Sequence, residues 1–215
     1  MLHRRTVLAG LSASVLANPF PTPALAASTA SRNSEVFRDG DSIGTHTMEA
    51  VLGANGFEID ITIRLAVKVL GITAYRYELT NREVWKNGAI VSVSSTVNDD
   101  GTDDFSRIKR DGDGLKIEGS RHNGAASLNS VTTSYYATPF LERRPWISTQ
   151  TGVPLKVSVN PEGRANWWSV TGELETKLGY KDGEWVACEF DAGGELAEYK
   201  LVRQSGKIGA LWAQA

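Results

Sequence analysis

The sequence predicts an all-β fold, an antiparallel meander whose sheet curves strongly into a half-barrel or a barrel. Three observations predict it. Residues 57–69 alternate, with an apolar side chain at every odd position. Asn-Gly and Asp-Gly dipeptides, which supply the positive φ values of tight hairpins, recur along the chain. Most of the runs between them are about ten residues long, which is typical of an antiparallel all-β domain.

The run Phe57–Val69 shows the alternation most clearly. On a strand, successive side chains point to opposite faces, so this run has one apolar and one largely charged face. On a helix, Asp60 and Arg64 would be buried among the isoleucines. At about 3.3 Å per residue the strand reaches roughly 40 Å. A strand of that length coils, and a coiled sheet with one apolar face closes or half-closes around its interior.

The amino-terminal residues predict a cleavable export signal over residues 1–26. Arg4 and Arg5 precede a mildly apolar run that is too short to span a bilayer, and Ala24-Leu25-Ala26 forms a small-x-small cleavage site. The paired arginines resemble a twin-arginine translocation (Tat) signal, although Val7 stands where that motif usually carries Phe. The Tat and Sec export machineries are therefore both candidate partners. We expect a soluble periplasmic protein without a transmembrane segment.

Small polar residues at 27–34 predict a flexible linker, which leaves residues 35–215 as a single antiparallel β domain. Short hairpin links favour a sequential meander over a sandwich that crosses between sheets. The expected strands are Glu35–Arg38, Ser42–Val51, Phe57–Val69, Ala74–Trp85, Ala89–Asn98, Phe105–Arg110, Leu115–Glu118, Ser127–Thr133, Leu155–Val159, Trp167–Glu175, Glu184–Phe190 and Leu196–Arg203.

Two irregularities are expected within this pattern. One short helix is predicted near residues 138–144, because Thr138 can cap it, Pro139 fits its first turn and Pro145 ends it. Val84 falls out of phase with the apolar residues earlier in its strand, which predicts a β-bulge near Asn81.

Composition argues against several function classes. The net charge of −2 provides no basic footprint for nucleic acid. Cys188 is the only cysteine, so no internal disulfide can form, and its place in step with Val186 and Phe190 predicts a buried, inert thiol. No cofactor motif and no Gly-x-Ser-x-Gly nucleophile elbow occurs.

No metal site is predicted. If Gly101 in the acidic run 98–104 is aligned with the sixth position of an EF-hand loop, Arg107 occupies the twelfth, where calcium binding requires Glu. His46 and His122 show no tight spacing with Cys188, so zinc is not indicated either.

One pair of carboxylates is a candidate for a catalytic pair. Glu58-Ile-Asp60 resembles the start of the Glu-x-Asp-x-Glu strand of laminarinase-like glycoside hydrolases. Thr62 occupies the third position, so the second catalytic carboxylate is missing. A carbohydrate-active enzyme using Glu58 and Asp60 is one alternative function, but no residue is assigned as catalytic.

The leading hypothesis is a non-enzymatic binder or carrier of a lipid-like or other apolar ligand. The apolar face of the long strand and its neighbours would line a groove, and burial of apolar surface contributes about 25 cal/mol per Å². The candidate ligand-binding residues are Phe57, Ile59, Ile61, Ile63, Leu65, Val67, Tyr75, Tyr77 and Trp167.

The alternative is a structural or interaction module whose apolar face is filled by its own helix around Phe140 and Leu141. A sizeable exposed apolar patch would favour that alternative.

Several local patterns extend along the chain. They are Phe37–His46, Val67–Tyr77, Glu83–Gly88, Ser95–Gly101, Thr132–Tyr136 and Ser148–Gly152. Together they resemble a family of bacterial exported proteins known only as a domain of unknown function, over about Val36–Arg203. The resemblance implies a curved antiparallel sheet similar to the half-barrels of LolA/LolB-like periplasmic lipoprotein carriers. It implies no reaction and no catalytic residue.

Overall fold

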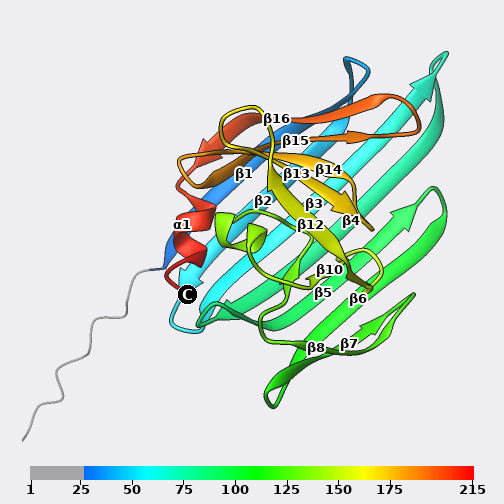
Figure 1. Ribbon diagram of the computed structural model, residues 1–215. Coiled ribbons are helices and arrows are strands. Elements are labelled where there is room, and N and C mark those ends of the chain that lie inside the picture. Colours follow the sequence, from blue (N-terminus) through cyan, green and yellow to red (C-terminus); the bar gives the residue numbers. More distant parts are fainter. Residues whose placement is uncertain (1–26) are drawn as a thin grey trace, which may run out of the picture.

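The computed structural model describes residues 27–215, which fold around one large antiparallel sheet of 13 strands (Figure 1). Strands β12 and β8 form its two edges, and within residues 27–215 these edges do not pair with each other. The sheet is therefore a curved half-barrel, as the sequence predicted. The predicted export signal, residues 1–26, lies outside the described residues.

The strand order shows two meanders that meet in the middle of the sheet. Across the sheet the order is β12-β13-β14-β15-β16-β1-β2-β3-β4-β5-β6-β7-β8, so the first strand pairs with the last. The strands are β1 (Ser28–Arg38), β2 (Asp41–Gly53), β3 (Gly56–Val69), β4 (Ile72–Lys86), β5 (Ala89–Asp99), β6 (Thr102–Asp111), β7 (Gly114–Gly119), β8 (Asn123–Ser127), β12 (Val157–Pro161), β13 (Trp167–Gly172), β14 (Thr176–Lys181), β15 (Glu184–Asp191) and β16 (Leu196–Ser205).

Between the two edge strands the chain crosses the concave side of the sheet (Figure 1). We call residues 128–156 the crossing segment. It contains the 3-10 helix η1 (Thr138–Leu141) and a small sheet of β9 (Val131–Thr132), β10 (Trp146–Ile147) and β11 (Pro154–Leu155). The carboxyl end of the chain adds α1 (Ile208–Trp212), which contacts β1, β2 and β15. None of the helices in residues 27–215 is long and apolar enough to cross a membrane.

The alternation that predicted the long strand is confirmed in β3. Its first odd-numbered side chains, Phe57, Ile59 and Ile61, are at most 3% exposed on the concave face. The even-numbered Asp60 and Arg64 are exposed on the convex face. The side-chain period of a strand therefore decides which residues reach the interior.

The bulge predicted near Asn81 is wrong. Asn81 and Glu83 stay in phase with Leu79 and Trp85, and all four side chains are buried on the concave face. The register shift between β4 and β5 lies instead at Val84/Trp85. Asn81 and Glu83 are polar, so the sequence did not show that they occupy concave positions. The side chains of the crossing segment that hydrogen-bond to them are distant in the sequence.

Other predictions need correction. Residues 28–34, predicted as a linker, belong to β1, where Ala30, Arg32 and Ser34 alternate inward and the backbone pairs with β2 and β16. The predicted helix ends earlier, at Leu141, and Thr138 is its first residue, with no side-chain cap. The predicted strand 127–133 is reduced to β9, whereas β14 and α1 were not foreseen.

A buried carboxylate joins the crossing segment to the sheet. Glu83 in β4 is 0% exposed and accepts four hydrogen bonds. Two come from its own strand, from Asn81 at 2.8 Å and Trp85 at 2.9 Å. Two come from the crossing segment, from Ser134 at 2.6 Å and Tyr136 at 2.9 Å. Because buried polar groups are costly without partners, this cluster fixes the crossing segment against the sheet.

We predict that Glu83→Gln lowers the free energy of unfolding by about 2 kcal/mol, since the amide nitrogen cannot accept the two hydrogen bonds that one carboxylate oxygen now accepts. Urea denaturation measures the change. The control is Glu78→Gln, at an exposed position of the same strand, which should shift stability by less than about 0.5 kcal/mol. Equal stabilities of the two variants would show that the Glu83 cluster does not hold the fold.

Candidate ligand-binding cavity

The concave face of the sheet encloses a cavity of about 380 Å³. One wall comes from β2, β3 and β4, another from β14, β15 and β16, and the crossing segment covers part of the opening. Apolar lining side chains are Ile61, Ile63, Leu65, Leu79, Leu155 and Leu174. Ligand pockets in proteins typically measure about 300–1,000 Å³ and are mostly apolar, so this cavity has the size and lining of a small-molecule site.

Strand β3 passes through two different environments along the concave face. At its start, Phe57 contacts Tyr136 of the crossing segment, with ring centroids 5.7 Å apart. In the same region Trp85 packs against Phe140 at 5.3 Å. Further along the strand, Ile63 and Leu65 are half-buried and line the cavity. The concave face is therefore filled by the chain itself at one end and hollow at the other.

The nine predicted ligand-binding residues divide accordingly. Ile61, Ile63, Leu65, Tyr75 and Tyr77 line the cavity. Phe57 and Ile59 lie in the filled core at 0% exposure, and Val67 lies outside the lining although it faces the same side, opposite Tyr75.

Trp167 was misplaced because sequence alone did not show which face of β13 is concave. Its ring packs flat over Gly179, where an added Cβ would lie 2.8 Å from the indole. The Arg164 guanidinium lies 3.8 Å from the ring centroid. Trp168, one residue further, points to the other face and packs against Tyr180 at 5.4 Å.

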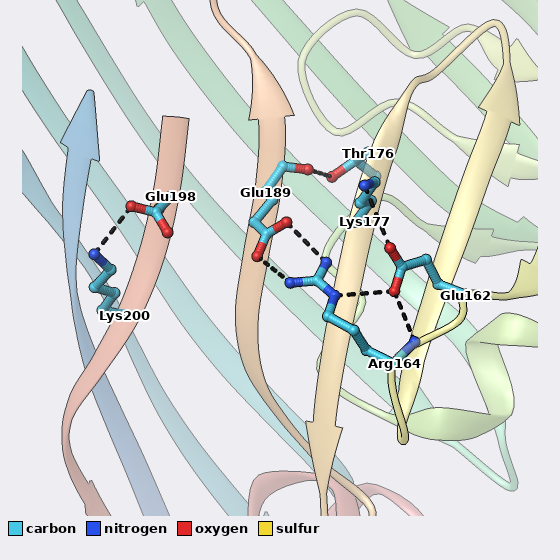
Figure 2. A network of polar contacts seen from close by, with 7 residues as sticks. All are labelled: Glu162, Arg164, Thr176, Lys177, Glu189, Glu198 and Lys200. Atoms are coloured by element: carbon cyan, nitrogen blue, oxygen red, sulfur yellow. Dashed lines mark hydrogen bonds and ion pairs between the residues drawn. The ribbon is translucent and has the colours of Figure 1, made fainter. Parts of the chain in front are cut away.

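Arg164, which lies over the Trp167 ring, belongs to a charged network (Figure 2). Arg164 pairs with both carboxylate oxygens of Glu189 and also with Glu162, while Lys177 pairs with Glu162. Hydrogen bonds from Arg164 hold the pKa of Glu162 at about 2. Trp167 therefore belongs to a solvated, ion-paired surface and not to the cavity.

The paired carboxylates also lie on the convex face. Arg82 forms ion pairs with both Asp60 and Glu58, and all three side chains are at least one third exposed. The cavity lies on the opposite side of the sheet, so this pair does not face an enclosed substrate site. Across residues 27–215, no three His, Cys, Asp or Glu side chains gather in a way that could hold a metal ion.

Buried polar side chains line the inner wall of the cavity. His46 is 5% exposed, and its ring makes edge contacts with Trp185 and Tyr199 at centroid distances of 5.3 and 5.4 Å. Burial, with a smaller contribution from the charge of Arg32, lowers the pKa of His46 to about 3. The imidazole is therefore neutral near neutral pH, with one donor and one acceptor nitrogen.

Four tyrosines, Tyr75, Tyr77, Tyr135 and Tyr199, add hydroxyl groups to the lining. Burial raises the pKa of each of them, so the hydroxyls stay protonated. The Tyr75 hydroxyl donates to Asp99 at 2.7 Å. These groups make the cavity amphipathic, with neutral donors and acceptors beside an apolar wall.

Cys188 also lines the cavity and is 4% exposed, as predicted for a buried thiol. Burial raises the pKa of the thiol to about 12, and Thr176 lies 3.0 Å from the sulfur. A thiol rather than a thiolate is present near neutral pH, and the thiolate is the nucleophilic form. The lining therefore favours binding over covalent chemistry.

The family of this chain follows from a comparison with family models. The domain-of-unknown-function family DUF6134 matches residues 35–202. The chain belongs to this family. That match contains the strands of the large sheet except residues 28–34 of β1 and 203–205 of β16, and it includes all the residues that line the cavity. No curated protein and no solved structure matches the chain.

His46, Asn81 and Tyr199 line the cavity but were not predicted as site residues from the sequence. The alternation of side chains along β2 could have identified His46, because it lies in phase with the buried Met48 and Ala50.

We predict that His46 makes the protein less stable in acid. Its pKa is 6.5 when unfolded and about 3 when folded, so between these values the unfolded state binds the extra proton. The contribution of the neutral His46 to the free energy of unfolding is therefore fully present above pH 6.5 and is lost as the pH falls towards 3. Between pH 7 and pH 5 this residue should cost about 2 kcal/mol.

The measurement is urea denaturation of the wild type and of His46→Gln at both pH values. The variant should lose about 2 kcal/mol less than the wild type over this interval. Parallel losses in the two proteins would show that His46 is accessible to protons in the folded state.

Proposed function

We propose that this DUF6134 protein is an exported, periplasmic binder or carrier, without enzymatic activity, that holds a lipid-like or other apolar ligand in the concave cavity. The observation that carries the proposal is the division of the concave face. The crossing segment fills it at Phe57, yet a cavity of about 380 Å³ opens at Ile63 and Leu65.

Export is supported by the sequence of residues 1–26, which resembles a Tat signal with a small-x-small cleavage site. The carrier role is supported by the resemblance of the curved sheet to the half-barrels of LolA/LolB-like lipoprotein carriers. Both supports come from the sequence, and the cavity adds a third that is independent of them.

Burial of hydrocarbon supplies enough free energy for such a role. Each buried methylene contributes about 0.8 kcal/mol, so an alkyl chain with about ten buried methylenes gains on the order of 8 kcal/mol before the cost of association. No catalytic group is needed for this binding.

We predict that the double substitution Ile63→Trp/Leu65→Trp abolishes ligand binding, because two indoles would occupy the apolar wall of the cavity. The control is Thr62→Trp/Arg64→Trp, which places the same side chains on the convex face of the same strand. Native mass spectrometry and solvent extraction of protein purified from periplasm without detergent measure the bound ligand.

The wild type and the control should carry an apolar small molecule, and the cavity variant should carry at least about tenfold less. The proposal is wrong if no ligand accompanies the wild type, or if the cavity variant retains it at the wild-type level.

A second candidate function, an interaction module, is favoured by the turn between β3 and β4. Val69, Leu70 and Ile72 are 56%, 99% and 74% exposed. Leu70 also has φ of 52°, a left-handed conformation that costs a residue with a side chain about 1–2 kcal/mol. An exposed leucine at a strained position adds nothing to the core, which suggests a role in contact with another surface.

We predict that Leu70→Asn raises the free energy of unfolding by about 0.5–1 kcal/mol, since Asn adopts the left-handed region more easily than Leu. The same variant should keep the ligand content of the wild type, because Leu70 does not line the cavity. Urea denaturation and native mass spectrometry measure the two effects. A loss of ligand in this variant would favour a role of the turn in ligand uptake over a separate interaction role.

A further inference from the structure

Three residues that line the cavity carry buried polar atoms without partners among residues 27–215. Within the part of the chain that the structure describes, neither ring nitrogen of His46, nor Nε1 of Trp185, nor Oδ1 of Asn81 has a hydrogen-bond partner. These three residues are 5%, 1% and 3% exposed, and each lines the cavity. Buried polar groups are nearly always satisfied in proteins, and a molecule bound in the cavity would supply partners to these residues.

The register of the strands shows how these groups are arranged. His46 and Trp185 are in edge contact on one wall. His46 of β2 lies opposite Ile63 of β3, which in turn lies opposite Leu79 of β4. Asn81 is the next inward-facing residue of β4 after Leu79, two strands away from His46. The register therefore places His46 and Asn81 on either side of Ile61 and Ile63 of β3, and all four residues line the cavity.

The chemistry of the three groups defines what they can bind. Trp185 Nε1 only donates, Asn81 Oδ1 only accepts, and a neutral imidazole does both. The amide nitrogen of Asn81 is already engaged with Glu83 and Ser134. A ligand group that both donates and accepts, as a hydroxyl does, is complementary to this set.

The charges around the cavity argue against an acid. Asp99 and Glu175 are the charged lining residues, and no Lys or Arg side chain from residues 27–215 is among them. Arg32 is not a lining residue: its guanidinium lies 5.9 Å from the ring centroid of Trp185 and forms an ion pair with Glu184 at 2.9 Å. A carboxylate in the cavity would lose its hydration beside two acids without gaining a counter-ion.

We propose that the cavity selects an uncharged lipid that carries a hydroxyl group, which hydrogen-bonds to His46 and Trp185 while its hydrocarbon part lies along β3. This inference rests on the proposed binding function and specifies its ligand class. A cationic amphiphile is the main competitor, because tyrosines and Asp99 line the cavity. A quaternary ammonium group, however, can neither donate to His46 nor accept from Trp185.

The test compares 1-dodecanol, dodecanoate and dodecyltrimethylammonium, which share one chain length, by isothermal titration calorimetry near neutral pH. All measurements stay below the solubility limit of the alcohol and the micelle-forming concentrations of the two charged ligands. The alcohol should bind at least about tenfold more tightly than either charged ligand. Tighter or equal binding of dodecanoate or of the ammonium overturns the inference and leaves the binding function intact. Failure of all three to bind overturns the binding function as well.

Two variants identify the residues responsible. His46→Phe keeps an aromatic ring and removes both ring nitrogens, and Trp185→Phe removes a single donor. In each, the preference for the alcohol over dodecanoate should fall by about fivefold or more. Thr47→Val, at the neighbouring position that faces away from the cavity, should leave the preference unchanged.

Because the rank order of ligands is measured on the wild type, it does not depend on whether either variant folds. If both variants fold and both keep the wild-type preference, the assignment to His46 and Trp185 is wrong.

Discussion

The structure depends on how the concave face of one long curved sheet is covered. A sheet with an apolar face must bury it, and here the crossing segment, together with α1, does so at one end only. The Glu83 cluster holds that segment in place, since Glu83 accepts hydrogen bonds from Ser134 and Tyr136 as well as from its own strand. A buried carboxylate with four donors ties the segment to one place on β4, whereas apolar packing alone allows sliding.

This anchoring determines where the hollow end lies. Tyr136 and Phe140 occupy the space over Phe57 and Trp85, so the remaining concave surface around Ile63 is left for the cavity. The wall there combines an apolar strand with neutral polar groups, and the carboxylates that resembled a catalytic pair lie on the other side of the sheet. The arrangement suits binding of an amphipathic molecule more than catalysis.

Much of the fold followed from the sequence because strand parity and turn chemistry are local. Alternation over residues 57–69 correctly assigned Ile61 inward and Asp60 outward. Local rules failed where partners are distant: Asn81 and Glu83 looked misplaced on an inward face because Ser134 and Tyr136 lie more than 50 residues later in the chain. Side-chain alternation also did not show whether Trp167 points to the concave or the convex face, since nothing in its own strand identifies the concave side.

The most direct test of the divided concave face is an isotope-filtered nuclear Overhauser measurement on methyl-labelled protein with bound 1-dodecanol. Ile63 and Ile59 lie on the same face of β3, one at the cavity and one in the filled core. The account predicts cross-peaks from the alkyl chain to the methyl groups of Ile63 and Leu65 and none to Ile59. Contacts to Ile59, or to exposed residues such as Val202 in place of Ile63, would contradict it.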